Sequence, residues 1–310
     1  MEHVLELSPE SMVIGYIDNA TPPVLEVESG DTVVFEIAGS GGNAVSEETT
    51  LEELVKLLQS RAPEAGMHSL TGPIAVRGAM PGQVLKVDIL DIVLREYGFN
   101  FQLPSDMQKG LLPGDFPKGR IAHYRNNLED MTIELYPGVV APLKPFMGIL
   151  ATAPSEPGKH HSVPPWDFGG NLDLAAAGVG TSVYLPVQVA GANFFAGDAH
   201  SVQGDGEVCT SAIETAFSRV EVRLEVLDTG PLVRPRVETD DSWITLGINE
   251  DLLVASQQAI RDMIELIGTL YGIPAEDAYT ICSATVDLSI SQIVNGVRGV
   301  HATLPKSIFV

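Results

Sequence analysis

The sequence predicts an α+β protein that is rich in β-structure, with packed β-sheets of a sandwich or barrel type and a helical C-terminal region. Three observations predict this class. Strand patterns recur along most of the chain, turn-forming residues are plentiful (30 Gly and 21 Pro), and the longest helical pattern falls late instead of alternating with strands. We expect a β-rich domain over residues 1–235 and a helix-containing region over residues 236–310 that packs on it.

Three segments have clear strand patterns. Residues 32–37 are rich in β-branched and aromatic side chains and follow a Ser-Gly-Asp turn. Leu85, Val87 and Ile89 stand at alternate positions after a Pro-Gly turn. Residues 220–226 alternate apolar with charged side chains. This last pattern predicts an antiparallel strand with one buried face and one wet face.

Two segments have helical patterns. Thr50 and Glu53 form a capping box ahead of an apolar helical face. A longer helix follows Asn249, which we expect to cap its N-terminus, and ends at Gly272. The apolar face of this second helix predicts core packing and contains Leu252, Ala255, Ala259, Met263, Ile267 and Leu270. Scattered Gly and Pro in residues 104–145 and 154–171 predict short strands and loops.

The charge balance limits the partners that the protein can have. The formal net charge is −23, so nucleic acid and anionic membrane surfaces repel the protein. The sequence contains no apolar run long enough for a transmembrane helix, and residues 1–9 do not read as a secretory signal. Two cysteines are too few for a disulfide framework. We therefore expect a cytoplasmic protein.

Side chains that could carry chemistry are concentrated in residues 166–214, against a background of Gly, Ala and apolar residues. Asp198 and His200 are two positions apart, so an extended strand would place both side chains on one face. A carboxylate beside an imidazole suits a divalent metal such as zinc. The alternative is a surface Asp and His where a strand begins.

The segment Gln203–Glu207 has a second pattern, in which two glycines bracket Asp205. This predicts a tight turn with positive φ at one position. Such a turn would bring Glu207 back toward Asp198 and His200, where a carboxylate could accept a proton from an attacking water. The alternative is a plain hairpin with Asp205 at its tip.

Two further segments could contribute to a site. After Gly169-Gly170, an extended chain would place Asn171 and Asp173 on one face, and the paired glycines would let a substrate approach. A glycine turn with an Asx cap explains the same residues equally well. His68 lies where a loop is expected to become a strand.

These segments resemble the acetamidase/formamidase family. The matching residues follow one order along most of the chain: His68 with Thr71-Gly72-Pro73, Gly78-Ala79, Pro81-Gly82, Leu85-Lys86-Val87, Phe168 to Asn171, Asp173, Gly197 to His200, Gln203 to Glu207, Asp287, Gln292 to Val294 and Leu304 to Lys306. Gly197 to Glu207 is the most specific part. The chain departs from the family pattern at Gln83 and at Trp166-Asp167.

The resemblance implies a hydrolase that cleaves short aliphatic amides, of the formamide or acetamide type, to ammonia and a carboxylate by metal-activated water. It also implies a divalent metal, with zinc the expected ion, and a homodimer or a larger homo-oligomer. On this interpretation the metal ligands are Asp173, Asp198 and His200, the catalytic residues are Glu207 and His68, and the substrate contacts are Asn171 and Gln203.

Two alternative functions stay open at this point. Cys209 follows Glu207 closely and could act as the nucleophile of a thiol amidase, although no neighbouring Lys or His would activate it. The chain could also be a non-catalytic metal-binding or small-molecule-binding protein on the same scaffold. A serine triad is disfavoured because no G-x-S-x-G motif is present. Whether Asp167, Asp205, Glu214 or Cys209 joins the site is left open.

Overall fold

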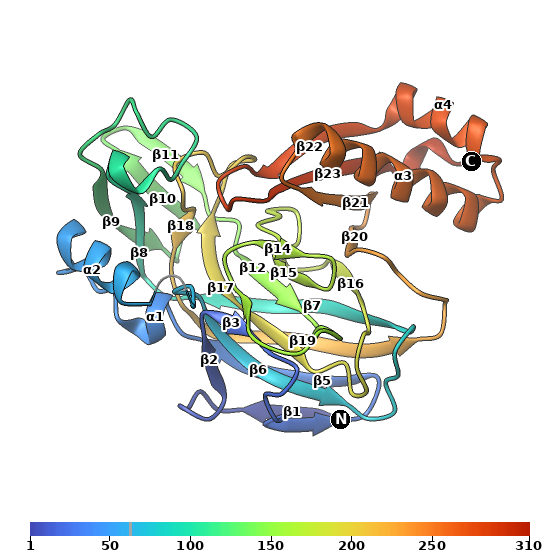
Figure 1. Cartoon of the computed structure of the whole chain (residues 1–310), viewed down its shortest axis with the longest axis horizontal. Helices are drawn as coiled ribbons and strands as arrows, with labels where there is room; N and C mark the ends of the chain where they lie inside the picture. Colours follow the sequence, from blue (N-terminus) through green and yellow to red (C-terminus); the bar gives the residue numbers. More distant parts are fainter. Residues whose placement is uncertain (62–63) are drawn as a thin grey trace.

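Two large β-sheets dominate the protein and share one hydrophobic core (Figure 1). The computed structural model describes residues 1–61 and 64–310. The prediction of packed β-sheets with a helical C-terminal region is confirmed.

The first sheet joins the N-terminal strands to the C-terminal region. Its strands, in spatial order, are β1 (Glu2–Leu5), β5 (Asp31–Ile37), β19 (Phe217–Leu227), β7 (Val84–Leu94), β16 (Ser182–Pro186), β20 (Arg236–Glu238), β21 (Ser242–Asn249), β23 (Arg298–Pro305) and β22 (Asp287–Gln292). The last four strands continue the sheet past residue 235. The division of the chain at residues 235 and 236 stays a prediction.

The second sheet carries the residues of interest for function. Its strands, in spatial order, are β11 (Val139–Pro142), β10 (Thr132–Tyr136), β9 (Arg120–Asn127), β8 (Tyr97–Gln102), β18 (Ile213–Glu214), β17 (Phe194–Val202), β12 (Phe146–Ala151), β15 (Gly169–Asn171) and β14 (Pro165–Trp166). β6 (Ser69–Val76) pairs with β17, β2 (Met12–Ile14) and β4 (Leu25–Val27), and a small separate sheet pairs β13 (His160–His161) with β3 (Tyr16–Ile17).

The three predicted strands lie side by side in the first sheet. β5, β19 and β7 are neighbours, and β19 runs antiparallel to both of the others. Val220, Val222 and Leu224 are fully buried, whereas Arg223 is exposed. The buried face of these strands packs on residues of β6, β12 and β17, so the core lies between the two sheets.

The first predicted helix is α2 (Leu51–Arg61), and its capping box is confirmed. The Thr50 backbone N–H donates to Glu53 Oε2 at 2.9 Å, and the Glu53 backbone N–H donates to Thr50 Oγ1 at 3.3 Å. These two bonds satisfy amides that have no partner within the helix. α2 lies beside β8 and β9 and follows the short segment α1 (Ser40–Asn43) (Figure 1).

The second predicted helix is α3 (Leu252–Tyr271), and the prediction of its cap was wrong. The Asp251 carboxylate, not Asn249, accepts from the Leu253 and Val254 backbone N–H groups. Asn249 Oδ1 instead accepts from the Asp251 backbone N–H at 2.9 Å and shapes the turn ahead of the helix. Gly272 ends the helix with φ 68°, as predicted.

The apolar face of α3 is buried only in its middle. Ala255, Ala259, Met263 and Ile267 are buried against β21, β23 and α4 (Ala275–Thr285). The predicted members at the two ends, Leu252 and Leu270, are 37% and 42% exposed and stay outside this buried face. Short 3-10 helices occur at η1 (Ser105–Met107) and η2 (Lys306–Ile308).

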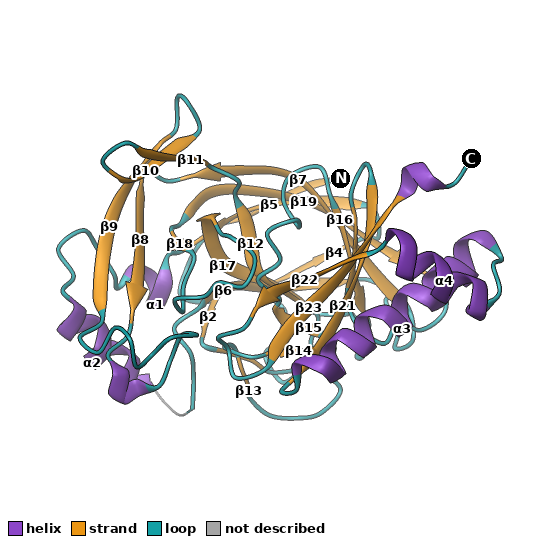
Figure 2. Cartoon of the chain, turned by 90° about the horizontal axis from the view of Figure 1, so that it is seen from above, coloured by secondary structure: helices purple, strands orange, loops and turns teal. Residues whose placement is uncertain are grey.

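The helices occupy opposite ends of the molecule (Figure 2). α1 and α2 flank the second sheet at one end, while α3 and α4 lie together at the other. Within residues 1–61 and 64–310, no helix combines the length and apolarity needed to cross a bilayer.

Candidate metal and active site

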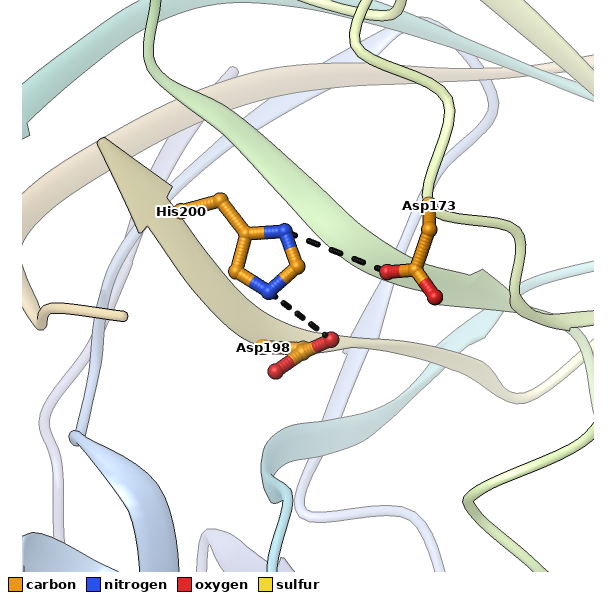
Figure 3. A group of neighbouring side chains, drawn as sticks. All are labelled: Asp173, Asp198 and His200. Atoms are coloured by element: carbon orange, nitrogen blue, oxygen red, sulfur yellow. Dashed lines mark ion pairs between the residues drawn. The ribbon is translucent and has the colours of Figure 1, made fainter. Parts of the chain in front are cut away.

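His200 and Asp198 lie inside β17, in the middle of the second sheet, and not at a strand entry. His200 is fully buried, and its Nε2 atom is 3.3 Å from Asp198 Oδ2 (Figure 3). Asp198 has φ 60°, so the strand is locally irregular at this residue. The predicted proximity of the two side chains is confirmed, but a left-handed residue within the strand contributes to it.

Asp173 approaches the same imidazole from the other side, just after β15. Its Oδ1 atom is 3.9 Å from His200 Nδ1 (Figure 3). Asp173 also has a left-handed backbone, with φ 45°. Its other carboxylate oxygen accepts a 2.7 Å hydrogen bond from Asn295 Nδ2, and its backbone carbonyl accepts one from Gln203 Nε2 at 2.8 Å. These bonds fix the carboxylate toward His200.

Two glutamates complete the cluster. Glu214 of β18 is the cross-strand partner of His200, and its Oε1 atom is 3.3 Å from His200 Nε2. Glu207 follows Gly206, which supplies the predicted positive φ of 99°. One ligand atom from each of His200, Glu207 and Glu214 lies within 4.8 Å of the other two. The predicted turn therefore brings Glu207 to His200.

Backbone bonds to the C-terminal region hold this turn in place. The Gly206 N–H donates to Ser291 O at 3.0 Å, and the Ile293 N–H donates to Gly206 O at 3.1 Å. Asp205 points outward and is 3.9 Å from His301 Nε2. Hydrogen bonds to Ser291 and Ile293 thus fix the backbone of the turn next to Glu207, whereas the Asp205 side chain is half exposed.

The donor set fits a divalent cation. Asp173, Asp198 and His200 form a second group with ligand atoms within 4.8 Å of one another. In the described part of the chain, both His200 ring nitrogens, Asp173 Oδ1 and Glu207 Oε2 are buried without a hydrogen-bond partner. Buried polar atoms are usually paired, and carboxylate with imidazole ligands suit zinc. A cation bound beside one ring nitrogen of His200 would satisfy buried atoms that have no partner among the described residues.

The charge balance of the cluster supports the same conclusion. Burial, together with the Asp198 carboxylate, raises the pKa of Asp173 to about 8. Burial and the charge of Asp173 raise the pKa of Glu207 well above its usual range. Burial opposes a charged His200, but the carboxylates of Asp198 and Glu214 outweigh it and raise the pKa of that imidazole. Four buried carboxyl groups around one imidazole need protons or a cation to offset their repulsion.

A cavity of about 420 Å³ opens onto this cluster. Asp198, Glu207 and Glu214 lie at its polar end. His68 and Asn171, both predicted site residues, also line it. A cavity of this size is within the usual range for ligand sites, roughly 300–1,000 Å³.

His68 and Asn171 have different environments. His68 Nε2 is 4.0 Å from Asp198 Oδ1, and its Nδ1 atom forms a 2.7 Å hydrogen bond with Ser162 Oγ. Asn171 Nδ2 donates to Val163 O at 3.0 Å, which leaves its buried Oδ1 atom without a partner among the residues that the structure describes. Both side chains are oriented by a contact behind them.

Other predicted candidates are not among the described residues that line the cavity. Gln203 is not among the described residues that line the cavity, and its amide nitrogen binds the backbone carbonyls of Asp173 and Ser291. Asp167 is 3.9 Å from Arg234 and largely exposed. Cys209 contacts Asn100 and Ser211 and is absent from the described lining of the cavity.

Two residues that shape the cluster were missed at the level of sequence. Asn295 orients Asp173, but it is 122 positions away and belongs to a C-terminal loop. Gly148 of β12 lies against both Asp173 and Asp198, so any side chain there would collide with the two carboxylates. The preceding residue, Met147, belongs to the core between the sheets. A glycine between two buried apolar residues of a strand is the one local signal that could have marked this close approach.

Comparisons with known proteins identify a family for this chain. The model of the acetamidase/formamidase family matches residues 17–161 and 157–310. The chain belongs to the acetamidase/formamidase family. The resemblance seen in the sequence is therefore confirmed. The prediction of a hydrolase that acts on carbon–nitrogen bonds of linear amides is confirmed at the level of the family.

Individual family members match over different lengths. The formamidase of Methylophilus methylotrophus is 27% identical and aligns with 93% of this chain and 87% of its own. A relative from Schizosaccharomyces pombe is 26% identical over 66% of this chain, which spans 61% of that protein. The crystal structure of an acetamidase from Bacillus halodurans has a TM-score of 0.88 and 29% identity, with 98% of each chain covered.

Proposed function

We propose that this chain hydrolyses a linear amide to ammonia and a carboxylate, with a divalent metal held by Asp173, Asp198 and His200. The observation that carries the proposal is the buried acidic cluster at the polar end of the cavity, with several ligand atoms that lack a hydrogen-bond partner among the described residues. Zinc is the proposed ion, because it binds imidazole and carboxylate together. Glu214 is a further candidate ligand, since it lies 3.3 Å from His200 Nε2.

A metal bound by these residues would lower the pKa of a water and polarise the amide carbonyl. We assign Glu207 the role of general base in this proposal. Its Oε2 atom is buried beside His200 and Asp173, and it has no hydrogen-bond partner among residues 1–61 and 64–310. In the proposed reaction Glu207 accepts a proton from the attacking water and delivers it to the amide nitrogen as ammonia leaves. The water oxygen forms the new carbon–oxygen bond as the carbon–nitrogen bond breaks.

His68 and Asn171 would orient the substrate. With the Ser162 hydroxyl donating to Nδ1, His68 Nε2 carries the proton and can donate to the developing oxyanion. Asn171 Oδ1, which has no hydrogen-bond partner among residues 1–61 and 64–310, can accept from the amide N–H group. Gln203, proposed from the sequence as a substrate contact, supports Asp173 from behind in this arrangement.

The proposal is tested by ammonia release from formamide, acetamide, propionamide and urea, with metal-stripped protein measured before and after zinc is added. Zinc-dependent release from an amide is the expected result. Release that is independent of metal and lost on alkylation of Cys209 would support the thiol mechanism instead. Bound zinc with no release from any amide would favour the non-catalytic alternative. The homo-oligomer and the cytoplasmic location stay predictions.

A further inference from the structure

The cavity beside the acidic cluster has an aromatic wall. Phe99 and Phe101 stand at alternate positions of β8, so both rings lie on one face of the strand. Their ring centres are 6.2 Å apart and the rings are inclined by 22°. Glu214 is the cross-strand partner of Phe99, so the wall begins directly beside the acidic cluster.

A second part of the lining is aliphatic and comes from α2. Leu54 and Leu58 are four residues apart, lie on one helical face and line the cavity. Leu54 packs with Phe99 and Met67 in a small hydrophobic cluster that is separate from the main core. Leu103 and Met107, which follow β8, also line the cavity. The cavity is thus polar at the acidic cluster and lined by apolar side chains beyond it.

The dimensions of this region exceed the needs of the smallest amides. Formamide and acetamide have only a few non-hydrogen atoms, whereas a cavity of about 420 Å³ is of a size that encloses much larger ligands. A small amide at the cluster would leave the walls of Phe101 and Leu58 facing water. An apolar group on the substrate would displace that water and gain hydrophobic free energy.

From this geometry we infer that the enzyme prefers primary amides with a bulky apolar acyl group over formamide and acetamide. The inference rests on the proposed amide hydrolysis and deepens it. Release of ammonia leaves no substituent on the nitrogen, so the apolar group must extend from the carbonyl carbon. With the carbonyl at the acidic cluster, this group extends along the apolar lining toward Phe101 and Leu58.

The test compares kcat/KM for formamide, acetamide, butyramide, hexanamide and phenylacetamide. Each buried methylene is expected to raise kcat/KM by about fourfold until the apolar region is filled. Leu58→Trp should fill the outer part of the cavity and lower the ratio of kcat/KM for hexanamide to that for acetamide by at least about tenfold. Leu57→Trp is the matched control, because Leu57 is partly buried on α2 but lies outside the described lining. It should leave the ratio unchanged.

The outcomes separate the inference from the proposed function. If kcat/KM falls beyond acetamide in the unmodified protein, the preference for bulky acyl groups is wrong while amide hydrolysis stands. If no amide is hydrolysed, the proposed function fails, and binding of hexanamide is then measured by ligand-observed NMR. Binding of hexanamide that exceeds binding of acetamide and is lost in Leu58→Trp would support the apolar substrate pocket. Absence of such binding would overturn it.

Discussion

Gly148 of β12 lies directly against the Asp198 side chain of β17. A Cβ atom at residue 148 would overlap the Asp198 carboxylate and lie 2.7 Å from Asp173 Oδ1. The pairing of the two strands continues on either side, with Met147 opposite Ala199 and Ile149 opposite Gly197. The absence of a side chain at residue 148 thus gives the two carboxylates the space to converge on His200.

Gly148→Ala should therefore weaken metal binding. We expect the zinc affinity to fall by about 10-fold to 100-fold, the loss typical when the support of a ligand is removed. The measurement is competition with a zinc indicator. Gly204→Ala is the control, since no atom lies within 4 Å of a Cβ at that position and the residue is exposed. Equal affinities for the two variants would contradict the proposed ligand set.

Glu207→Gln should retain the metal and lose turnover. Glutamine keeps the size of the side chain but cannot accept the proton of the attacking water. We expect kcat to fall by about 10²-fold to 10⁴-fold, with metal content unchanged by elemental analysis. Asp205→Asn changes a half-exposed side chain two residues away, and its kcat should be close to that of the unmodified protein. Full activity of Glu207→Gln would remove this residue from the role of base.

Removal of the metal should destabilise the fold. A cation that binds only the folded state raises its stability, and its loss also leaves four carboxyl groups in mutual repulsion. We expect a chelator to lower Tm by several degrees and zinc to restore it, in thermal unfolding followed by circular dichroism. In Asp198→Asn, the chelator should lower Tm far less than in the unmodified protein. In Asp167→Asn, the chelator should lower Tm as much as in the unmodified protein, since Asp167 lies beside Arg234 and outside the cluster.

We expect the Asp88 carboxylate to make a pH-dependent contribution to the free energy of unfolding. Burial opposes its charge, but hydrogen bonds from Ser182, Lys86 and Arg223 outweigh burial and lower the pKa of Asp88. A lowered folded pKa adds stability above the unfolded value of about 3.9, and this stability is lost as the pH falls through the folded pKa. Asp88→Asn should cost about 1–3 kcal/mol at neutral pH. Urea unfolding at decreasing pH should show this difference shrinking; a constant difference would contradict the prediction.

Two residues before α3, Asn249 and Asp251, are candidate N-caps, and their substitutions should have different effects on stability. Asp251→Ala should cost about 1 kcal/mol of unfolding free energy, because the Leu253 and Val254 amides lose their acceptor. Asn249→Ala removes only the bond to the Asp251 amide and should cost less. Urea unfolding of the two variants decides between them. A larger loss for Asn249→Ala would favour the cap predicted from the sequence.

Local patterns predicted the elements and much of the cluster. The alternation at residues 220–226 and the Thr50–Glu53 box depend on neighbours along the chain, and both formed as predicted. The spacing of Asp198 and His200 and the glycines around Asp205 likewise brought three side chains together. Each of these predictions needed only periodicity and turn chemistry.

Pairing between distant segments could not be predicted in the same way. Glu214 joins the site because β18 pairs with β17 in a register that places it opposite His200. Asn295 reaches Asp173 through the packing of a C-terminal loop. Asn249 precedes α3 by several residues, and sequence alone did not distinguish it from Asp251 as the cap. These details depend on strand register and on the course of loops, which carry no local signature.

The bond between Asn295 and Asp173 also has a consequence for the order of folding. It spans 122 residues, and the hydrogen bonds of Ser291 and Ile293 with Gly206 also join segments that are far apart in the sequence. Contacts between such distant parts of a chain form slowly, because the intervening chain must first be ordered. We expect the ligands to reach their final positions only after the end of the chain has been synthesised and has docked. A ribosome-bound nascent chain that stops before residue 290 lacks Ser291, Ile293 and Asn295, and should therefore have no competent ion-binding centre.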